Sequence, residues 1–261
     1  MNRIDKKFQE LKRKRKKAFI AFITAGDPNL KSTEQLVLAF EKAGVDIVEI
    51  GVPFSDPLAD GPTIQAASQR ALQKDVNLDQ ILNLVGRIRK SSQIPIALMT
   101  YYNPIFFYNE GRFLSKAKAC GVDGIIVPDL PPEEARDLIR LAKRQDISTV
   151  FFVSPTTTAK RMKLVAQASS GFIYYVSLTG VTGSRSKLPS SISGQIKLLK
   201  RITKKPVCVG FGISTPQQAR AVAKFSDGVI VGSAIVSAIE RNRGKRDLVK
   251  KVVKFVSNLA K

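Results

Sequence analysis

Short runs of apolar, mostly β-branched residues alternate with helical patterns from one end of the chain to the other. Each run is nearly continuous, as in parallel strands that are covered on both faces. Neither a linker nor a change of composition separates them, so we expect residues 1–261 to form one domain. Eight such strands predict an α/β fold of the (β/α)8 or TIM barrel type, and an open doubly wound sheet, which usually has fewer strands, is the alternative. The predicted strands are Ala18–Thr24, Val45–Gly51, Ile94–Thr100, Gly124–Pro128, Ser148–Val153, Phe172–Ser177, Val207–Phe211 and Gly228–Gly232.

Helical segments with start and stop signals lie between the predicted strands. Ser32, with a glutamine three residues later, predicts a capped helix start, and Gly44 predicts the end of that helix. Residues 215–218 (TPQQ) predict an N-cap, a proline at the first helical position and a glutamine at the third. Two helical stretches, residues 63–74 and 78–90, lie between the second and third strands, so one of them is an inserted helix.

Residue types that the chain lacks exclude several classes of chemistry. It contains no His, and its two cysteines, Cys120 and Cys208, have no metal-ligand spacing, so we expect no metal site. Proton transfer must then use carboxylates, tyrosines or lysines. No stretch approaches about 20 uninterrupted apolar residues, and no signal peptide opens the chain. We therefore expect no membrane span and a cytoplasmic protein, or one of the plastid stroma if its gene is organellar.

The chain is strongly basic, with a net charge of +22 and a dense group of Lys and Arg between residues 3 and 17. A surplus of this size suggests a nucleic-acid or membrane-surface partner. Ile4, Phe8 and Leu11 instead indicate an extra N-terminal amphipathic helix whose solvated face is basic. Neither a nucleic-acid signature nor an aromatic stacking platform accompanies the charge. Specific nucleic-acid binding is therefore disfavoured, and a basic barrel that binds nucleic acid is kept as a rival.

The segment from Glu49 to Gln65, EIGVPFSDPLADGPTIQ, holds the strongest candidates for catalysis. Strand alternation puts Glu49 on the same face as Ile47. If that face lines the barrel axis, burial raises the pKa of Glu49 and makes it a usable general acid. The loop after this strand carries Asp56 and Asp60, and barrels hold their chemistry in such loops.

None of the eight predicted strands contains a Lys or Arg. Glu49 thus has no obvious ion-pair partner, which favours a functional role over a buried structural ion pair, the alternative. A Schiff-base aldolase of the barrel type needs a strand lysine, and a metal-dependent aldolase needs His ligands, so both classes are excluded. Carbon–carbon bond chemistry would have to run on acid–base catalysis, with the substrate supplying its own electron sink.

Three glycine-bearing segments at strand ends predict a phosphate site: Gly180–Ser184, Gly210–Ser214 and Val231–Ala234. Glycine lets backbone N–H groups approach an anion, and barrel phosphate sites follow the seventh and eighth strands. Since turns need glycine in any case, an ordinary turn is the alternative for each segment taken alone.

Two further loops are candidates for substrate contact. Residues 178–190 have the length and polarity of a lid that closes over substrate, with an ordinary surface loop as the alternative. Residues 101–107 are expected to form the loop after the third strand. Tyr101 and Tyr174, at strand ends, either hold a substrate group or pack in the core.

Together these residues resemble the α subunit of tryptophan synthase, and the likeness covers nearly the whole chain. The segment from Glu49 to Gln65 is its most specific motif. The other matching segments are 22–28 (FITAGDP), 98–104 (LMTYYNP), 127–130 (VPDL), 174–183 (YYVSLTGVTG) and 210–214 (GFGIS).

The resemblance implies a lyase reaction, the aldol cleavage of indole-3-glycerol phosphate to indole and glyceraldehyde 3-phosphate. Glu49 would move protons at indole C3 and at the glycerol hydroxyl. Asp60 would accept the indole N–H and stabilise the positive charge of an indolenine-like intermediate, which is the electron sink. Such a subunit carries no cofactor of its own.

The resemblance also implies which residues contact the substrate. Thr182 would meet Asp60 when the lid closes. The phosphate would bind to Gly183, Gly212, Gly232 and Ser233. The indole pocket would be lined by Phe22, Tyr101, Ile126, Tyr174 and Phe211.

Members of this family work in an α–β–β–α assembly, in which indole passes to a pyridoxal-phosphate β subunit. Asp56 would lie in the loop facing that partner, and Asp129 near the communication between loops. A rival barrel of the same pathway, indole-glycerol-phosphate synthase, would need catalytic lysines on the strands. A non-catalytic subunit that only activates its partner would be signalled by loss of Glu49 or Asp60, and both are present.

Overall fold

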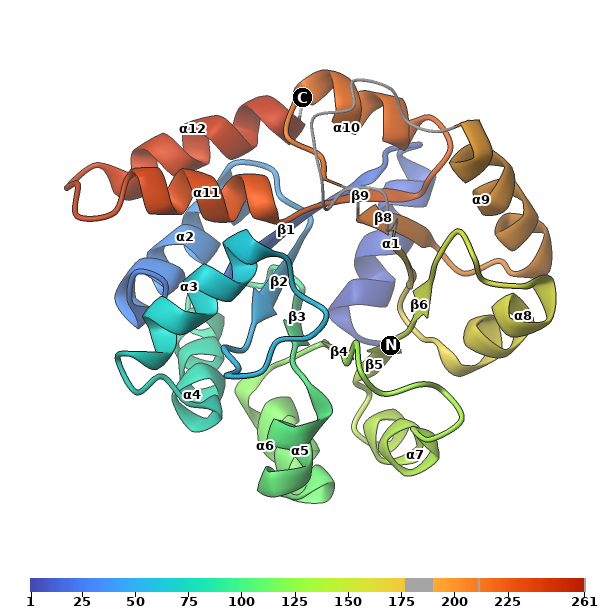
Figure 1. The fold of residues 1–261 in the computed structure, drawn as a ribbon, viewed down its shortest axis with the longest axis horizontal. Helices are drawn as coiled ribbons and strands as arrows, with labels where there is room; N and C mark the ends of the chain where they lie inside the picture. Colours follow the sequence, from blue (N-terminus) through green and yellow to red (C-terminus); the bar gives the residue numbers. More distant parts are fainter. Residues whose placement is uncertain (177–189, 211, 261) are drawn as a thin grey trace.

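The computed structural model describes residues 1–176, 190–210 and 212–260. Its parallel strands form a nearly closed barrel surrounded by helices (Figure 1). The predicted barrel is thereby confirmed and the open sheet is wrong, while the assignment of residues 1–261 to one domain stays a prediction. The strands are β1 (Ala18–Thr24), β2 (Ile47–Gly51), β3 (Ile96–Met99), β4 (Gly124–Ile126), β5 (Ser148–Val150), β6 (Phe152–Val153), β7 (Ile173–Val176), β8 (Val207–Gly210) and β9 (Gly228–Val231).

The strand order, β5-β4-β3-β2-β1-β9-β8-β7-β6, places β5 and β6 at the two ends of the sheet. These two are halves of the single strand predicted over Ser148–Val153, which is interrupted at Phe151. β5 pairs with β4, and β6 pairs with β7. Residues 148–153 therefore pair with β4 through their first half and with β7 through their second half. The barrel closes at Phe151, between the two halves.

Helices cover the outside of the barrel, and α1 lies behind it in the view of Figure 1. The helix inserted after the second strand is present, since α3 and α4 both precede β3. Among the described residues, no helix combines the length and apolar character that crossing a membrane requires. The helices are α1 (Arg3–Arg13), α2 (Leu30–Lys42), α3 (Pro62–Leu72), α4 (Leu78–Arg89), α5 (Tyr102–Tyr108), α6 (Glu110–Cys120), α7 (Arg136–Arg144), α8 (Ala159–Ala168), α9 (Ser190–Ile202), α10 (Pro216–Ala223), α11 (Ser233–Arg241) and α12 (Leu248–Ala260).

Strand alternation divides the core into two layers. Val48 and Ile50 of β2 belong to the layer between the strands and the helices. Ile47 belongs to the cluster inside the barrel, together with Ile20 and Ile230 of the neighbouring strands. The face of β2 that carries Ile47 therefore lines the barrel axis, and by alternation so does Glu49.

Helix α1 closes the amino end of the barrel. Its apolar residues Ile4, Phe8 and Leu11 are buried in the interior cluster. The ring of Phe8 packs on that of Phe172, with centroids 5.8 Å apart. The predicted N-terminal amphipathic helix is thus confirmed, and its apolar face is fully used by the barrel.

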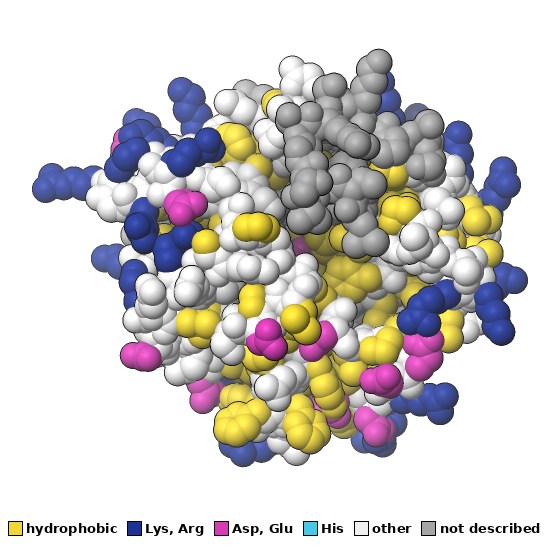
Figure 2. Space-filling view, in the orientation of Figure 1, with side chains coloured by type: hydrophobic (Ala, Val, Ile, Leu, Met, Phe, Trp, Pro, Cys, Tyr) yellow, Lys and Arg dark blue, Asp and Glu magenta, His cyan; other side chains and the backbone are white. Residues whose placement is uncertain are grey.

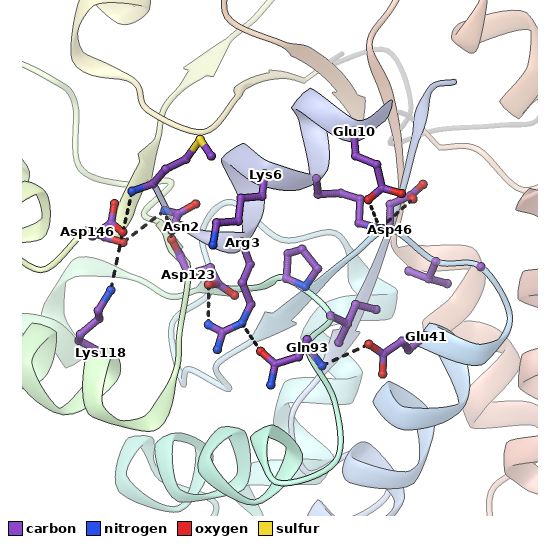
Figure 3. Close-up of a pocket in the computed structure, with 16 residues that line it drawn as sticks. Asn2, Arg3, Lys6, Glu10, Glu41, Asp46, Gln93, Lys118, Asp123 and Asp146 are labelled. Atoms are coloured by element: carbon purple, nitrogen blue, oxygen red, sulfur yellow. Dashed lines mark hydrogen bonds and ion pairs between the residues drawn. The ribbon is translucent and has the colours of Figure 1, made fainter. Parts of the chain in front are cut away.

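A buried polar network ties α1 to the amino ends of the strands. Asp123, 2% exposed, accepts hydrogen bonds from Arg3 (3.0 Å), from Arg89 of α4 (2.8 Å) and from the Ile96 N–H (2.9 Å). The side-chain amide of Asn2 donates to the Asp123 carbonyl at 2.9 Å. Figure 3 shows Asn2 and Arg3 pointing from α1 toward Asp123.

Two local predictions are wrong, and one is confirmed. Helix α2 is capped by Asn29, whose side chain accepts the Ser32 N–H at 2.8 Å, because asparagine caps as well as serine and comes first in the chain. The expected loop at residues 101–107 is largely helix α5. Its first N–H, on Tyr102, donates to the Asp129 carboxylate at 3.0 Å, a partner that local sequence does not show. The N-cap Thr215 and its capping box are confirmed.

Candidate active site

Glu49 is a fully buried carboxyl group inside the barrel. It pairs in register with Phe22 of β1 and Ala97 of β3. Among the described residues, neither carboxyl oxygen has a hydrogen-bond partner. Burial, with a smaller contribution from the charge of Asp60, raises the pKa of Glu49 from 4.5 to about 8. At neutral pH the group is therefore mainly protonated and able to donate a proton.

Asp60 reaches toward the same region from the loop between β2 and α3. Burial raises its pKa from 3.8 to about 6, and a hydrogen bond with the Tyr101 side chain partly offsets that rise. Since its pKa lies below neutrality, Asp60 is mainly a carboxylate when Glu49 is mainly an acid. Two carboxyl groups with opposite protonation states at one site are the arrangement that acid–base chemistry needs.

Tyr101 holds the loop that carries Asp60. Its hydroxyl accepts the Ala59 N–H at 2.8 Å, one residue before Asp60. Its ring stacks on Phe54 of the same loop, with centroids 5.1 Å apart and planes at 26°. Tyr101 is 4% exposed and so combines the two roles that the sequence left open, a core aromatic ring and a hydroxyl at the site.

A small cavity opens beside Asp60 at the carboxyl ends of β1, β2 and β3. The Phe22 ring covers Gly51, where a Cβ atom would lie 2.6 Å from the ring, so only glycine fits there. The hydroxyl of Thr24, 2% exposed, has no partner among the described residues. The lining residues are Phe22, Thr24, Gly51, Val52, Asp60, Ile64, Ser68, Met99 and Tyr101.

Sequence reasoning did not name six residues of this lining as site residues: Thr24, Gly51, Val52, Ile64, Ser68 and Met99. Thr24 ends its predicted strand and lies in the matching segment 22–28, and these are the signals that could have pointed to it. Ile64 and Ser68 come from α3, and the sequence does not show which side of that helix faces the barrel mouth.

Tyr174 and Ile126 lie on the inner wall of the barrel. Ile126 is fully buried in the interior cluster. The Tyr174 ring covers Gly210, where a Cβ atom would lie 2.5 Å from the ring, and packs on Phe152 with centroids 4.9 Å apart. Burial, followed by the charge of Glu49, raises the pKa of the Tyr174 hydroxyl well above its ordinary value, so this group stays protonated.

The predicted phosphate residues are described only in part. Gly183 lies outside the described residues. So do Thr182, predicted to meet Asp60, Phe211, predicted to line the indole pocket, and most of the proposed lid. Gly232 caps α11 without a side-chain hydrogen bond, and a Cβ atom there would lie 3.4 Å from the Phe22 ring. Ser233 and Gly212 are exposed. A helix that begins with a glycine presents its first N–H groups and its positive dipole end to an anion.

Asp56 and Asp129 are both exposed, on loops that the structure brings together. Asp129 caps α5 through the Tyr102 N–H, and the neighbouring Tyr101 holds the loop of Asp56 through Ala59. Large apolar side chains are exposed nearby: Leu58 (84%) on the Asp56 loop, and Phe106 (67%) and Phe107 (91%) on helix α5. In Figure 2, hydrophobic and acidic side chains gather on the face toward the viewer, with Lys and Arg around its rim.

Comparisons with known proteins agree on one family. A family model described as tryptophan synthase alpha chain matches residues 8–261. The tryptophan synthase alpha chain of Thermoanaerobacter sp. (strain X514) is 49% identical over 259 residues, covering 99% of this chain and 98% of that protein. The one from Geotalea daltonii is 50% identical over 245 residues, covering 94% and 93%.

Solved structures of the same family share the fold. Tryptophan synthase subunit alpha from Legionella pneumophila superposes with a TM-score of 0.93 at 40% identity, covering 100% of this chain and 97% of that one. A chain from the tryptophan synthase a2b2 complex of Pyrococcus furiosus gives a TM-score of 0.87 at 40% identity, covering 93% and 97%.

Proposed function

This chain belongs to the tryptophan synthase alpha chain family, and we propose that its barrel cleaves indole-3-glycerol phosphate to indole and glyceraldehyde 3-phosphate. The observation that carries the proposal is Glu49, a buried acid without a partner among the described residues, set close to a second carboxyl group. A barrel that kept only its fold would have no need to bury such a group at a free-energy cost.

In the first step Glu49 acts as a general acid. It donates its proton to indole C3, and the electron pair for the new C–H bond comes from the indole ring. The ring becomes an indolenine cation with positive charge at nitrogen. Asp60, a carboxylate at neutral pH, accepts a hydrogen bond from the indole N–H and stabilises that charge.

In the second step Glu49, now a carboxylate, acts as a general base. It takes the proton of the glycerol hydroxyl adjacent to C3, a carbonyl forms, and the carbon–carbon bond breaks. The bonding electrons return to the ring and restore neutral indole. Glu49 ends protonated as it began, so the cycle needs neither a metal nor a Schiff base.

The rest of the site would orient the substrate. The indole would lie among the aromatic and aliphatic residues of the barrel mouth: Phe22, Tyr101, Ile126, Tyr174 and Phe211. The described loops that follow strands contain no Lys or Arg. The phosphate would therefore depend on the amino end of α11 and on backbone or hydroxyl donors of Gly183, Gly212, Gly232 and Ser233, while Thr182 would meet Asp60.

The face around Asp56 and Asp129 would dock the β subunit of an α–β–β–α assembly, as in the a2b2 complex of Pyrococcus furiosus. Three large apolar side chains exposed beside these acids are typical of a protein interface. Pyridoxal phosphate would belong to the β subunit. The absence of a cofactor or metal on this chain and its cytoplasmic location stay predictions.

The pH dependence of indole release tests the chemistry. We expect kcat/KM for indole-3-glycerol phosphate to fall below about pH 6, as Asp60 takes up a proton, and above about pH 8, as Glu49 loses one. In Asp60→Asn the like charge beside Glu49 is gone, so the alkaline limit should move to lower pH while the rate drops. An unchanged alkaline limit in that variant would show that the charge of Asp60 does not affect the pKa of Glu49. That result would contradict the proposal.

The docking face is tested by adding a tryptophan synthase β subunit. Phe107→Ser should weaken the association more than tenfold, because a buried aromatic anchor contributes about 2 kcal/mol or more to an interface. Leu198→Ser on α9, which also alters an exposed apolar residue, is the matched control and should change little. Equal effects of the two substitutions would place the interface elsewhere.

A further inference from the structure

The last residues of α1 and the turn between α1 and β1 carry six consecutive cations, Lys12 to Lys17, and all six are exposed. Lys14 pairs with Glu10 at 2.6 Å, and Lys17 lies 3.8 Å from Asp227. The other four have no carboxylate partner among the described residues. This end of the barrel is opposite the candidate active site, so the proposed reaction does not use them.

Two other connections bring further cations to the same place. The Ala18 N–H donates to the Asp227 carbonyl at 2.9 Å, which joins the α1–β1 turn to the α10–β9 turn. Lys200 of α9 reaches Asp227 at 2.7 Å, and the Val207 N–H donates to the same carboxylate. These turns also hold the exposed Lys204 and Lys224. We call the group the basic end: Lys12, Arg13, Lys14, Arg15, Lys16, Lys17, Lys200, Lys204 and Lys224.

Charge is left uncompensated at the basic end, in contrast to the groove beside it. That groove, about 710 Å³ along α1, is also lined by charged residues. There, however, acids and bases pair: Arg3 with Asp123 and Lys118 with Asp146 (Figure 3). At the basic end, Glu10 and Asp227 are the acids that contact any of nine cations.

The backbone at Arg15 is left-handed, as it also is at Asp75 and Asp146 after α3 and α7. Arg15 follows the end of α1 with φ +53°, the left-handed conformation that glycine adopts more readily than other residues. Arginine at that position carries a conformational cost that glycine would avoid. Replacing Arg15 with glycine would therefore remove one guanidinium without straining the backbone.

We propose that the basic end binds the phosphate backbone of duplex nucleic acid without sequence specificity. The phosphates of a duplex are closely spaced charges, and the release of their counterions drives the binding of a cluster of exposed cations. Within the described part of the chain, the basic end presents no exposed aromatic ring for base stacking. Ile4, Phe8 and Leu11 of α1 are buried against the barrel, so no apolar face is free to enter a bilayer.

The test is the binding of a fluorescent 20-base-pair duplex to the full chain between 50 and 300 mM KCl. We expect micromolar affinity at the lowest salt and a log Kd that rises linearly with log salt. Arg13→Gln, Arg15→Gln and Lys16→Gln combined remove three unpaired cations, so the slope should fall by about 2.7 and the affinity by at least tenfold. The matched control combines Lys31→Gln, Lys160→Gln and Lys163→Gln, three exposed lysines of α2 and α8, and should bind within twofold of the parent.

Arg15→Gly separates binding from folding. Glycine suits the left-handed backbone, so the melting temperature should hold or rise while duplex affinity falls. Both triple variants should release indole at the parent rate. If both triple variants lost the same duplex affinity, the binding would depend on the overall charge of the protein and not on the basic end. That result would overturn the proposal. Binding to vesicles containing phosphatidylserine without binding to the duplex would overturn it as well.

Discussion

Each end of the barrel buries a carboxyl group, and the two meet opposite surroundings. At the amino end, Asp123 is 2% exposed and accepts hydrogen bonds from two guanidinium groups and a backbone N–H. Toward the carboxyl end, Glu49 is fully buried and, within the described part of the chain, has no donor. Both acids lose water, so the supply of partners decides which one is structural and which one titrates near neutral pH.

The topology explains this unequal supply. The helices run back from the carboxyl ends of the strands, so their last turns meet at the amino end. Those last turns are rich in Lys and Arg, which suits the negative end of the helix dipole, as in α4 and α9. The described loops after the strands have no Lys or Arg and carry Asp56, Asp60 and Asp129. The carboxyl end also holds ion pairs, since Arg70 of α3 pairs with Asp27 and Arg161 of α8 pairs with Glu133. Neither of these cations reaches Glu49, which among the described residues has no partner.

The largest expected effect is on catalysis at the acid without a partner. Glu49→Gln should lower kcat for indole release about a thousandfold or more, because general acid–base groups contribute on that scale. Asp46→Asn, which neutralises an acid just before the amino end of the same strand, is the control and should stay within a few-fold. Activity of Glu49→Gln within tenfold of the parent would remove Glu49 from its proposed role.

The same substitution should remove a loss of stability that the parent shows as the pH rises. The folded protein holds the Glu49 proton up to about pH 8, whereas the unfolded chain releases it near 4.5. Stability from this group is therefore present below pH 4.5 and is lost as pH rises toward 8, on the order of 3–5 kcal/mol. Urea unfolding at pH 5 and pH 8 should show the parent weakening relative to Glu49→Gln. If the free energy of unfolding changed equally with pH in the parent and in Glu49→Gln, Glu49 would not be a buried neutral acid.

At the amino end the prediction has the opposite sign. Asp123→Asn leaves Arg3 and Arg89 without their counter-charge and should lower the free energy of unfolding by about 3 kcal/mol, because a broken buried pair leaves an unpaired charge. Activity per folded molecule should change less than threefold. Asp137→Asn, which removes an exposed ion pair on α7, is the control and should alter stability by less than about 1 kcal/mol. If Asp123→Asn were as stable as the parent, the ion pairs of Asp123 would not be structural, and the contrast between Asp123 and Glu49 would be lost.

The smallest effect concerns the loop of Asp60. In Tyr101→Phe the acceptor of the Ala59 N–H is lost, together with the hydrogen bond that lowers the pKa of Asp60. We expect kcat to fall about fivefold, since one positioning hydrogen bond contributes about 1 kcal/mol. The acid limit of the rate profile should move to higher pH. Tyr102→Phe removes a hydroxyl bonded to Glu110 on the adjoining helices and serves as the control. If the acid limit of the rate profile did not move, the Tyr101 hydroxyl would have no effect on the pKa of Asp60, and only the packing of its ring would matter.

The sequence by itself determined the barrel and its central acid. Strand and helix periods are local, so alternation predicted which face of β2 Glu49 occupies, and composition excluded a cation on any strand. Local caps such as Thr215 were equally readable.

Only the tertiary structure decided which distant residues meet. The Asp129 carboxylate that starts α5, the interruption at Phe151 that closes the sheet and the hold of Tyr101 on the Asp60 loop each join segments far apart in the chain. So do the two guanidinium groups on Asp123. Such contacts depend on how the closed barrel brings its loops together, because a side chain's partner is set by position in space and not by the periodicity of its own segment.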